Sequence, residues 1–109
     1  MTSFQEQLTT LPSVDGIAAI VLLSAEGEAI HRLENRPGTA GSVRVYHALI
    51  KRHGHIDRKA AREGLELFAE HTAAARAEPG SHPNIDRLLA IAEHGAPGLR
   101  ARVVLEAEG

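Results

Sequence analysis

The chain has 109 residues, which is enough for one domain and too few for two domains that each bury a core. Cysteine is absent, which excludes disulfides, thiolate metal sites and thiol nucleophiles. The formal net charge of −2 argues against a basic nucleic-acid footprint, and no apolar run approaches the roughly 18 residues of a membrane helix. The first residues also lack the basic and apolar segments of a secretory signal. We therefore expect one cytoplasmic domain spanning residues 1–109, with neither a nucleic acid nor a membrane as its partner.

The seven histidines are the unusual feature of the composition. Protonation of all seven would change the formal net charge from −2 to +5. Histidine is the side chain whose charge ordinarily changes in mildly acidic solution. The histidine-rich composition thus predicts a pH-dependent solubility, and it does not by itself specify a site.

The first third of the chain predicts a short helix followed by a β-hairpin. Ser3 and Glu6 have the spacing of a capping box, and Pro12 closes the short helix. The apolar run at 17–23 is too short for a typical helix and predicts a strand that is buried on both faces. After a polar loop, residues 29–34 predict the returning strand of the hairpin.

Two helices are expected in the middle of the chain. A loop at 35–41 leads to a helix that we expect to be N-capped by Ser42 and to stop at Gly54. Residues 57–78 predict a longer helix, which is capped by its Asp57 and ended by a Pro-Gly pair.

The last third predicts one more helix and a strand. Ser81 or His82 caps a helix whose apolar residues recur at the spacing of one helical face, and residues 99–105 alternate between apolar and charged side chains. The order is then α-β-β-α-α-α-β. It indicates an α+β fold with a small antiparallel or mixed sheet of about three strands, covered on one side by helices.

The loop at residues 35–41, before the helix that is expected to start at Ser42, carries a candidate anion site. Gly38 and Gly41 let successive amides point at one spot, and the helix that starts at Ser42 adds partial positive charge there. Arg36 and Arg44 could neutralise a phosphate or a carboxylate. The loop has neither the Walker spacing nor the G-x-G-x-x-G spacing, and an ordinary turn with a serine cap explains the same residues.

A second candidate is a metal site at His53, His55 and Asp57, with His71 from the following helix as a further ligand. The H-x-H-x-D spacing occurs in metallo-β-lactamase-type hydrolases, where it binds one or two divalent metal ions. Arg58 stands where such motifs continue with histidine, and the chain is too short for that fold. A helix C-terminus at His53 and a helix cap at Asp57 are the plainer interpretation.

The sequence contains no set of residues that predicts catalysis. His82 and Asp86 lie one turn apart and could form an acid–base pair, but no nucleophile accompanies them. We therefore predict no catalytic residue and no cofactor. If the metal site forms, the cofactor would be a divalent metal ion.

Three stretches of the chain resemble an uncharacterised small bacterial domain family. They are 34–49 (ENRPGTAGSVRVYHAL), 61–71 (AREGLELFAEH) and 82–89 (HPNIDRLL). The resemblance spans nearly the whole chain and implies a free-standing bacterial domain with no assigned activity, so it transfers no site residue.

Together these observations predict a non-enzymatic binding or interaction domain with a small-anion site at the turn from Gly38 to Ser42. The alternative is a histidine-based metal-binding protein or metalloenzyme. A homodimer is expected because a second copy can pair with the exposed edge of a small sheet. Another protein is the alternative partner.

Overall fold

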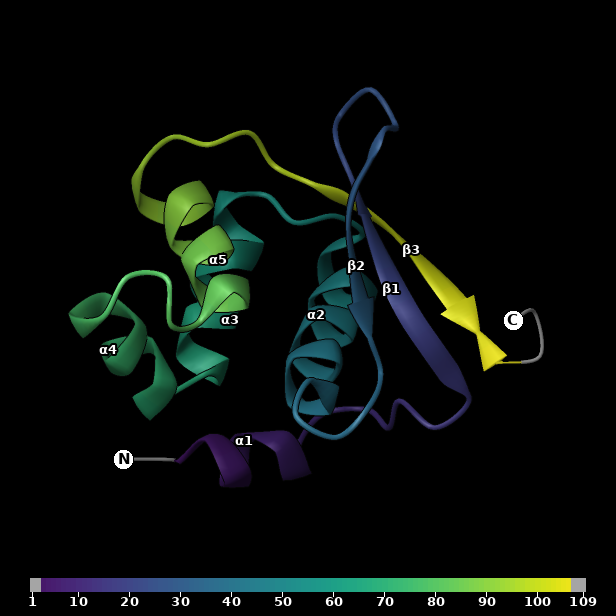
Figure 1. Cartoon of the computed structure of the whole chain (residues 1–109), viewed down its shortest axis with the longest axis horizontal. Coiled ribbons are helices and arrows are strands. Elements are labelled where there is room, and N and C mark those ends of the chain that lie inside the picture. Colours follow the sequence, from purple (N-terminus) through teal and green to yellow (C-terminus); the bar gives the residue numbers. More distant parts are fainter. Residues whose placement is uncertain (1–2, 107–109) are drawn as a thin grey trace.

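A computed structural model describes residues 3–106 of the chain. Within them, five helices and three strands form one α+β unit, with the helices gathered beside the sheet (Figure 1). The elements are α1 (Phe4–Thr9), β1 (Ile17–Leu23), β2 (Ala29–Glu34), α2 (Ala40–His53), α3 (Arg58–Leu67), α4 (Glu70–Ala77), α5 (Pro83–Glu93) and β3 (Arg100–Leu105).

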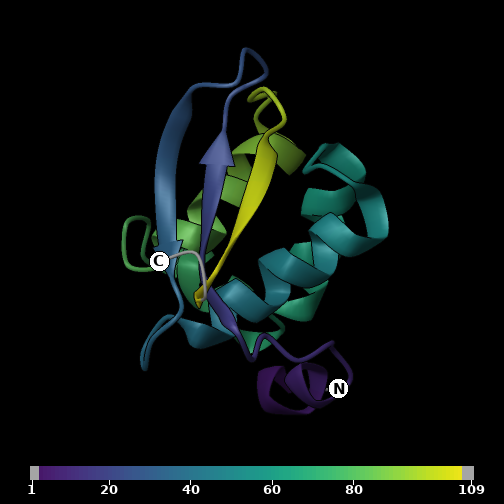
Figure 2. The ribbon, with the colours of Figure 1, turned by 90° about the vertical axis from the view of Figure 1, so that its right-hand side faces the viewer.

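The sheet has the strand order β2-β1-β3, and both pairs of neighbouring strands are antiparallel. Helices α2 to α5 lie between β2 and β3 in the chain. Strand β3 then pairs with the edge of β1 opposite to β2. Figure 2 shows the three strands in front of the helices, so the helices cover one face of the sheet. The predicted α+β class, order of elements and one-sided helical cover are confirmed.

The central strand β1 is apolar on both faces, as its sequence predicts. Ile20 and Leu22 are fully buried in the main core beneath the helices. Ala19 and Val21 point to the other face, where they pack with Val104 of β3 in a second, smaller cluster. This outer cluster lies on the side of the sheet that the helices do not cover.

Two of the four predicted helix caps form side-chain hydrogen bonds, those of α1 and α3, whereas His82 occupies the N-cap position of α5 without such a bond. Ser3 and Glu6 form the reciprocal capping box of α1, and Asp57 accepts a hydrogen bond of 2.8 Å from the Ala60 amide at the start of α3.

The predicted cap of α2 at Ser42 is wrong, because α2 begins at Ala40 with Thr39 in the capping position. The amides of Thr39 and Ala40 both donate to the carbonyl of Arg36, and this turn starts the helix three residues early. The Thr39 hydroxyl donates to the carbonyl of Glu34 and does not cap the helix.

The long helix expected at 57–78 is interrupted and forms α3 and α4. Ala69 adopts φ 51° and ψ −121°, and the amide of His71 donates across the turn to the carbonyl of Phe68. These angles are those of the first central position of a type II′ turn, where glycine is the ordinary residue. Ala69 is the only described residue other than glycine that has a positive φ. The backbone is therefore strained at this break.

The three central helices pack closely where α3 carries a glycine. A Cβ atom added to Gly64 would lie 2.7 Å from Leu88 on α5 and 2.9 Å from Leu49 on α2. Both leucines are buried, so the glycine sets the distance at which the three helices meet. None of the described helices is long and apolar enough to cross a membrane.

We predict that Ala69→Gly stabilises the protein. Glycine adopts positive φ without the steric cost that an L side chain incurs, so the free energy of unfolding should rise by about 1 kcal/mol. Urea unfolding followed by circular dichroism measures the change. Ala74→Gly, at an exposed position within α4, is the matched control and should lower stability by about 0.5–1 kcal/mol. Equal destabilisation by both substitutions would contradict the inferred strain.

We also predict that His47 makes stability depend on pH. Among residues 3–106, this half-buried imidazole of α2 has no hydrogen-bond partner for Nδ1. Burial, with a contribution from the charge of Lys51, lowers its pKa below the ordinary 6.5. Its contribution to stability is therefore present above 6.5 and is lost as the pH falls toward the lowered pKa of the folded state.

The measurement compares urea unfolding of the wild-type protein and His47→Gln at several pH values from about 7.5 down to about 5. The wild-type protein should lose more stability over this range than the variant. His94→Gln, at the exposed end of α5, is the control and should retain the wild-type pH dependence. The same loss of stability in the wild-type protein and His47→Gln would overturn the assignment.

Candidate functional site

A cavity of about 460 Å³ lies where α1, the start of α2, the break between α3 and α4, and the start of α5 meet. Its wall combines exposed backbone at the two helix starts with two imidazoles and an apolar floor. The lining residues are Phe4, Gln5, Leu8, Gly38, Thr39, Ala40, Gly41, Ser42, Phe68, His71, Ser81, His82, Pro83, Asn84 and Ile85.

Aromatic packing around Phe4 builds the floor. The Phe4 ring stacks on Phe68 with 5.5 Å between centroids, and His71 meets its face edge-on at 4.8 Å. The Phe4 ring packs directly against Gly41 of α2, because a Cβ atom added to this glycine would lie only 3.0 Å from the ring atom Cζ. A larger side chain at this glycine would displace Phe4 and with it the contact between α1 and α2.

The strained turn at Ala69 brings residues of the break to the cavity. It lies between Phe68 and His71, which both line the cavity and which, being three residues apart, would also share one face of an uninterrupted helix. Glu70, which follows the strained residue, accepts a 2.7 Å hydrogen bond from the amide of Phe4. The break therefore anchors the start of α1 as well as shaping the wall.

The start of α5 is fixed by the buried Tyr46 of α2. The Tyr46 hydroxyl donates to the carbonyl of Asn84 at 2.6 Å, and burial raises the pKa of this hydroxyl to about 12. Arg87 donates to the side-chain oxygen of the same asparagine at 3.0 Å. These bonds determine where the first turn of α5 opens into the cavity.

Several polar groups at the wall have no partner within the described part of the chain. The amides of Gly41 and Ser42 in the first turn of α2, and of Asn84 in the first turn of α5, donate no hydrogen bond there. The imidazoles of His71 and His82 lie 5.8 Å apart and likewise make no hydrogen bond with the described residues. The lining set contains no Asp or Glu. The wall is thus rich in donors and carries no fixed negative charge.

The structure places part of the predicted anion site at this cavity and part elsewhere. Gly38, Gly41 and Ser42 line the wall, but Arg36 and Arg44 do not.

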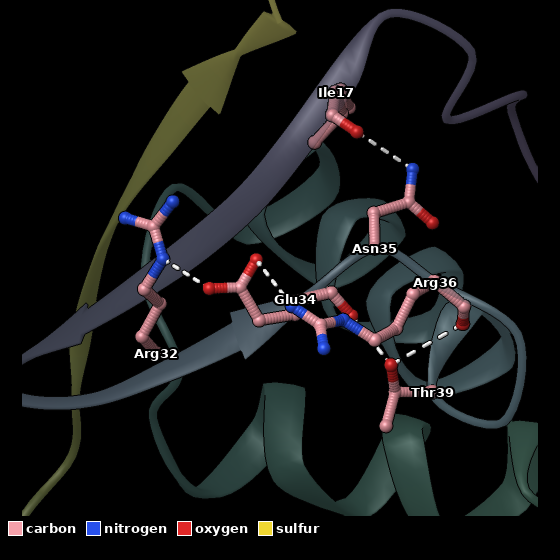
Figure 3. Close-up of polar contacts among 6 residues, drawn as sticks. All are labelled: Ile17, Arg32, Glu34, Asn35, Arg36 and Thr39. Carbon is pink, nitrogen blue, oxygen red and sulfur yellow. Dashed lines mark hydrogen bonds and ion pairs between the residues drawn. The ribbon is translucent and has the colours of Figure 1, made fainter. Parts of the chain in front are cut away.

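The two arginines bind other groups of the chain. Arg36 extends toward Glu34, with 3.7 Å between the charged groups, as Figure 3 shows. Arg44 donates to the carbonyls of Leu11 and Pro12 beyond α1.

The connection from β2 to α2 is tied to the sheet. Asn35 donates from its side chain to the carbonyls of Ile17, at 2.7 Å, and Val14, while the Thr39 hydroxyl bonds the end of β2 (Figure 3). These bonds hold the loop that presents Gly38, which adopts φ +95°, to the cavity.

The predicted metal ligands do not converge. His55 lies 3.4 Å from Asp57, His53 lies 3.4 Å from Glu63, and His71 lies at the cavity. Within residues 3–106, no three His, Asp or Glu side chains form a group that could hold a metal ion. The metal hypothesis therefore depends on the sequence spacing alone.

The acid–base pair considered for His82 and Asp86 is also absent from the described contacts. Asp86 accepts a 2.8 Å hydrogen bond from the amide of Gly80 and does not line the cavity. This bond ties the loop before α5 to the first turn of that helix.

Comparison with protein families identifies the chain. The model of an uncharacterised protein family conserved in bacteria, DUF2322, matches residues 4–102. The chain belongs to this family. The resemblance recognised in the sequence is thereby confirmed, and the DUF2322 match includes every residue that lines the cavity. No curated protein and no solved structure matches the chain.

Proposed function

We propose that this DUF2322 domain binds a small anion with an apolar body in the cavity between the starts of α2 and α5. The observation that carries the proposal is the convergence of two helix N-termini and two imidazoles on one cavity without a carboxylate in its wall. Helix N-termini favour negative charge because their first amides are unpaired and the helix dipoles add there.

The apolar floor narrows the class of ligand. Phe4, Leu8, Phe68 and Ile85 offer no polar side-chain groups, so an inorganic ion alone would leave this part of the cavity unfilled. A carboxylate or phosphate on an aromatic or aliphatic body would place its charge at the amides of Gly41 and its body on the rings. This division between an apolar surface and a few placed donors is typical of small-molecule sites.

Binding rather than catalysis is the interpretation that the side chains favour. The Ser81 hydroxyl donates to the carbonyl of Glu78, and Ser42 has no base within hydrogen-bond distance among the described residues. A serine nucleophile would require such a base.

The direct test is an amide NMR titration with benzoate, inorganic phosphate and the uncharged analogue benzyl alcohol. We expect benzoate at millimolar concentration to shift the amides of Gly41, Ser42 and Asn84 before others, and benzyl alcohol to shift them much less. The absence of shifts with both anions would remove the proposal. Equal shifts with benzoate and benzyl alcohol would show an apolar pocket without anion selectivity, which also contradicts it.

A charge introduced at Ser42 separates binding from folding. Ser42→Asp should weaken benzoate binding at least about tenfold, because the new carboxylate repels the ligand. An acid in the first turn of a helix favours the helix, so the fold should be retained. Ser24→Asp, in the hairpin loop, is the control and should bind benzoate as the wild-type protein does. Unchanged binding by Ser42→Asp would exclude this wall as the anion site.

Self-association and cellular location remain predictions from the sequence. A homodimer predicts a mass of twice 11.7 kDa in light scattering, and a monomer throughout the micromolar range contradicts it. A cytoplasmic location is expected from the composition, and fractionation of bacterial cells checks it.

A further inference from the structure

The outer face of the sheet and the edge of β3 from Ala101 to Val103 form a surface that the proposed anion site does not use. We propose that this surface binds an extended acidic segment of a partner protein, which adds to the sheet as a fourth strand beside β3. The proposal depends on the backbone, the charges and the contrast between the two sheet edges.

The backbone of β3 is unpaired on its outer edge at Ala101 and Val103, among the described residues. At the start of the strand, Leu99 exchanges two hydrogen bonds of 2.8 Å with Ile56, which pairs with it in antiparallel fashion. Backbone groups of an antiparallel strand point to alternate edges, so those of Ala101 and Val103 point the same way as those of Leu99. Neither has a hydrogen-bond partner on that side within residues 3–106. The chain's own bridge at Ile56 therefore begins a pairing that another strand can continue.

The charges on the outer face specify the chemistry of that strand. Arg100 and Arg102 are exposed on β3, opposite Leu23 and Val21 of the central strand, and neither forms an ion pair with a described residue. Two residues apart on one face of a strand, they lie about 7 Å from each other. This positive row stands beside the small apolar cluster of Val21 and Val104.

The neighbouring acid on this face is already neutralised. Glu34 of β2 lies 2.6 Å from Arg32 and also contacts Arg36 (Figure 3). The hydrogen bond from Arg32 is the main reason why the pKa of Glu34 lies below its ordinary value. The face thus has an excess of guanidinium groups, although the chain as a whole has a net charge of −2.

The edge at β2 is less suited to pairing. The register shifts where Leu22 and Leu23 face His31 and Ala29, so Ile30 forms a bulge. At the other end of the strand, the Thr39 hydroxyl occupies the carbonyl of Glu34. Bulges and covered ends are how proteins protect an edge from strand addition, and β3 lacks both over Ala101 to Val103.

An acidic partner fits β3 better than a second copy or a nucleic acid. An antiparallel second copy that pairs Ala101 with Val103 would set the two Arg102 side chains directly opposite each other, and like charges so placed destabilise a sheet. Single-stranded nucleic acids require aromatic platforms, whereas Tyr46 and both phenylalanines are buried on the helix side. A strand with carboxylates at alternate positions instead places acids beside Arg100 and Arg102.

The test uses a short fluorescein-labelled peptide of alternating Glu and Val, with a Lys–Val peptide as its counterpart. Fluorescence anisotropy should show binding of the Glu–Val peptide and no binding of the Lys–Val peptide. Arg102→Glu should weaken binding of the Glu–Val peptide at least tenfold, and Arg100→Glu with Arg102→Glu should reverse the preference between the peptides. Arg58→Glu, an exposed substitution on α3, is the control and should bind as the wild-type protein does.

Strand addition is distinguished from charge attraction by the backbone. Binding should protect the amides of Ala101 and Val103 from hydrogen exchange, and a Glu–Val peptide N-methylated at alternate positions on its pairing edge should lose binding. Unchanged binding by that methylated peptide, or by Arg102→Glu, overturns the proposal. Protection of both amides in a dimer without peptide also overturns it, because a second copy then occupies the edge. These outcomes are independent of benzoate binding on the helix side.

Discussion

The packing of Phe4 against Gly41 and Phe68 is the contact on which the cavity on the helical side of this domain depends. It joins the first helix to the start of α2 and to the break between α3 and α4, three segments that are distant in the sequence. Glu70 adds a hydrogen bond from the same break to the amide of Phe4. The cavity exists because these segments meet around one ring and leave the helix starts beside it uncovered.

Much of the fold follows from local patterns in the sequence. The apolar run of β1, the hairpin, the capping box at Ser3 and the cap at Asp57 each depend on residues that are close in the chain, and all agree with the structure. The break at Ala69 could not be predicted in this way, since neither glycine nor proline occurs there. It results from tertiary contacts: Phe68 is buried against Phe4, and Glu70 bonds the start of α1.

The sequence predicts which backbone segment contributes to the candidate site, but it does not predict which side chains line that site. The glycines at 38 and 41 mark a loop that enters a helix, and both line the cavity. Arg44 was expected to face the same spot, but it bonds carbonyls beyond α1 that lie more than 30 positions away in sequence. The rings of His71 and His82 lie 5.8 Å apart because the starts of two different helices pack together, a tertiary contact that no periodicity in the sequence indicates.

The buried tyrosine gives this protein a built-in optical reporter. Tyr46 is the only tyrosine of a chain without tryptophan, so at wavelengths above the phenylalanine band both the absorbance and the intrinsic emission arise from one phenol. That phenol is hydrogen-bonded to Asn84, where α5 opens into the cavity. A movement of this helix start therefore changes the spectrum of a single chromophore, without any attached dye.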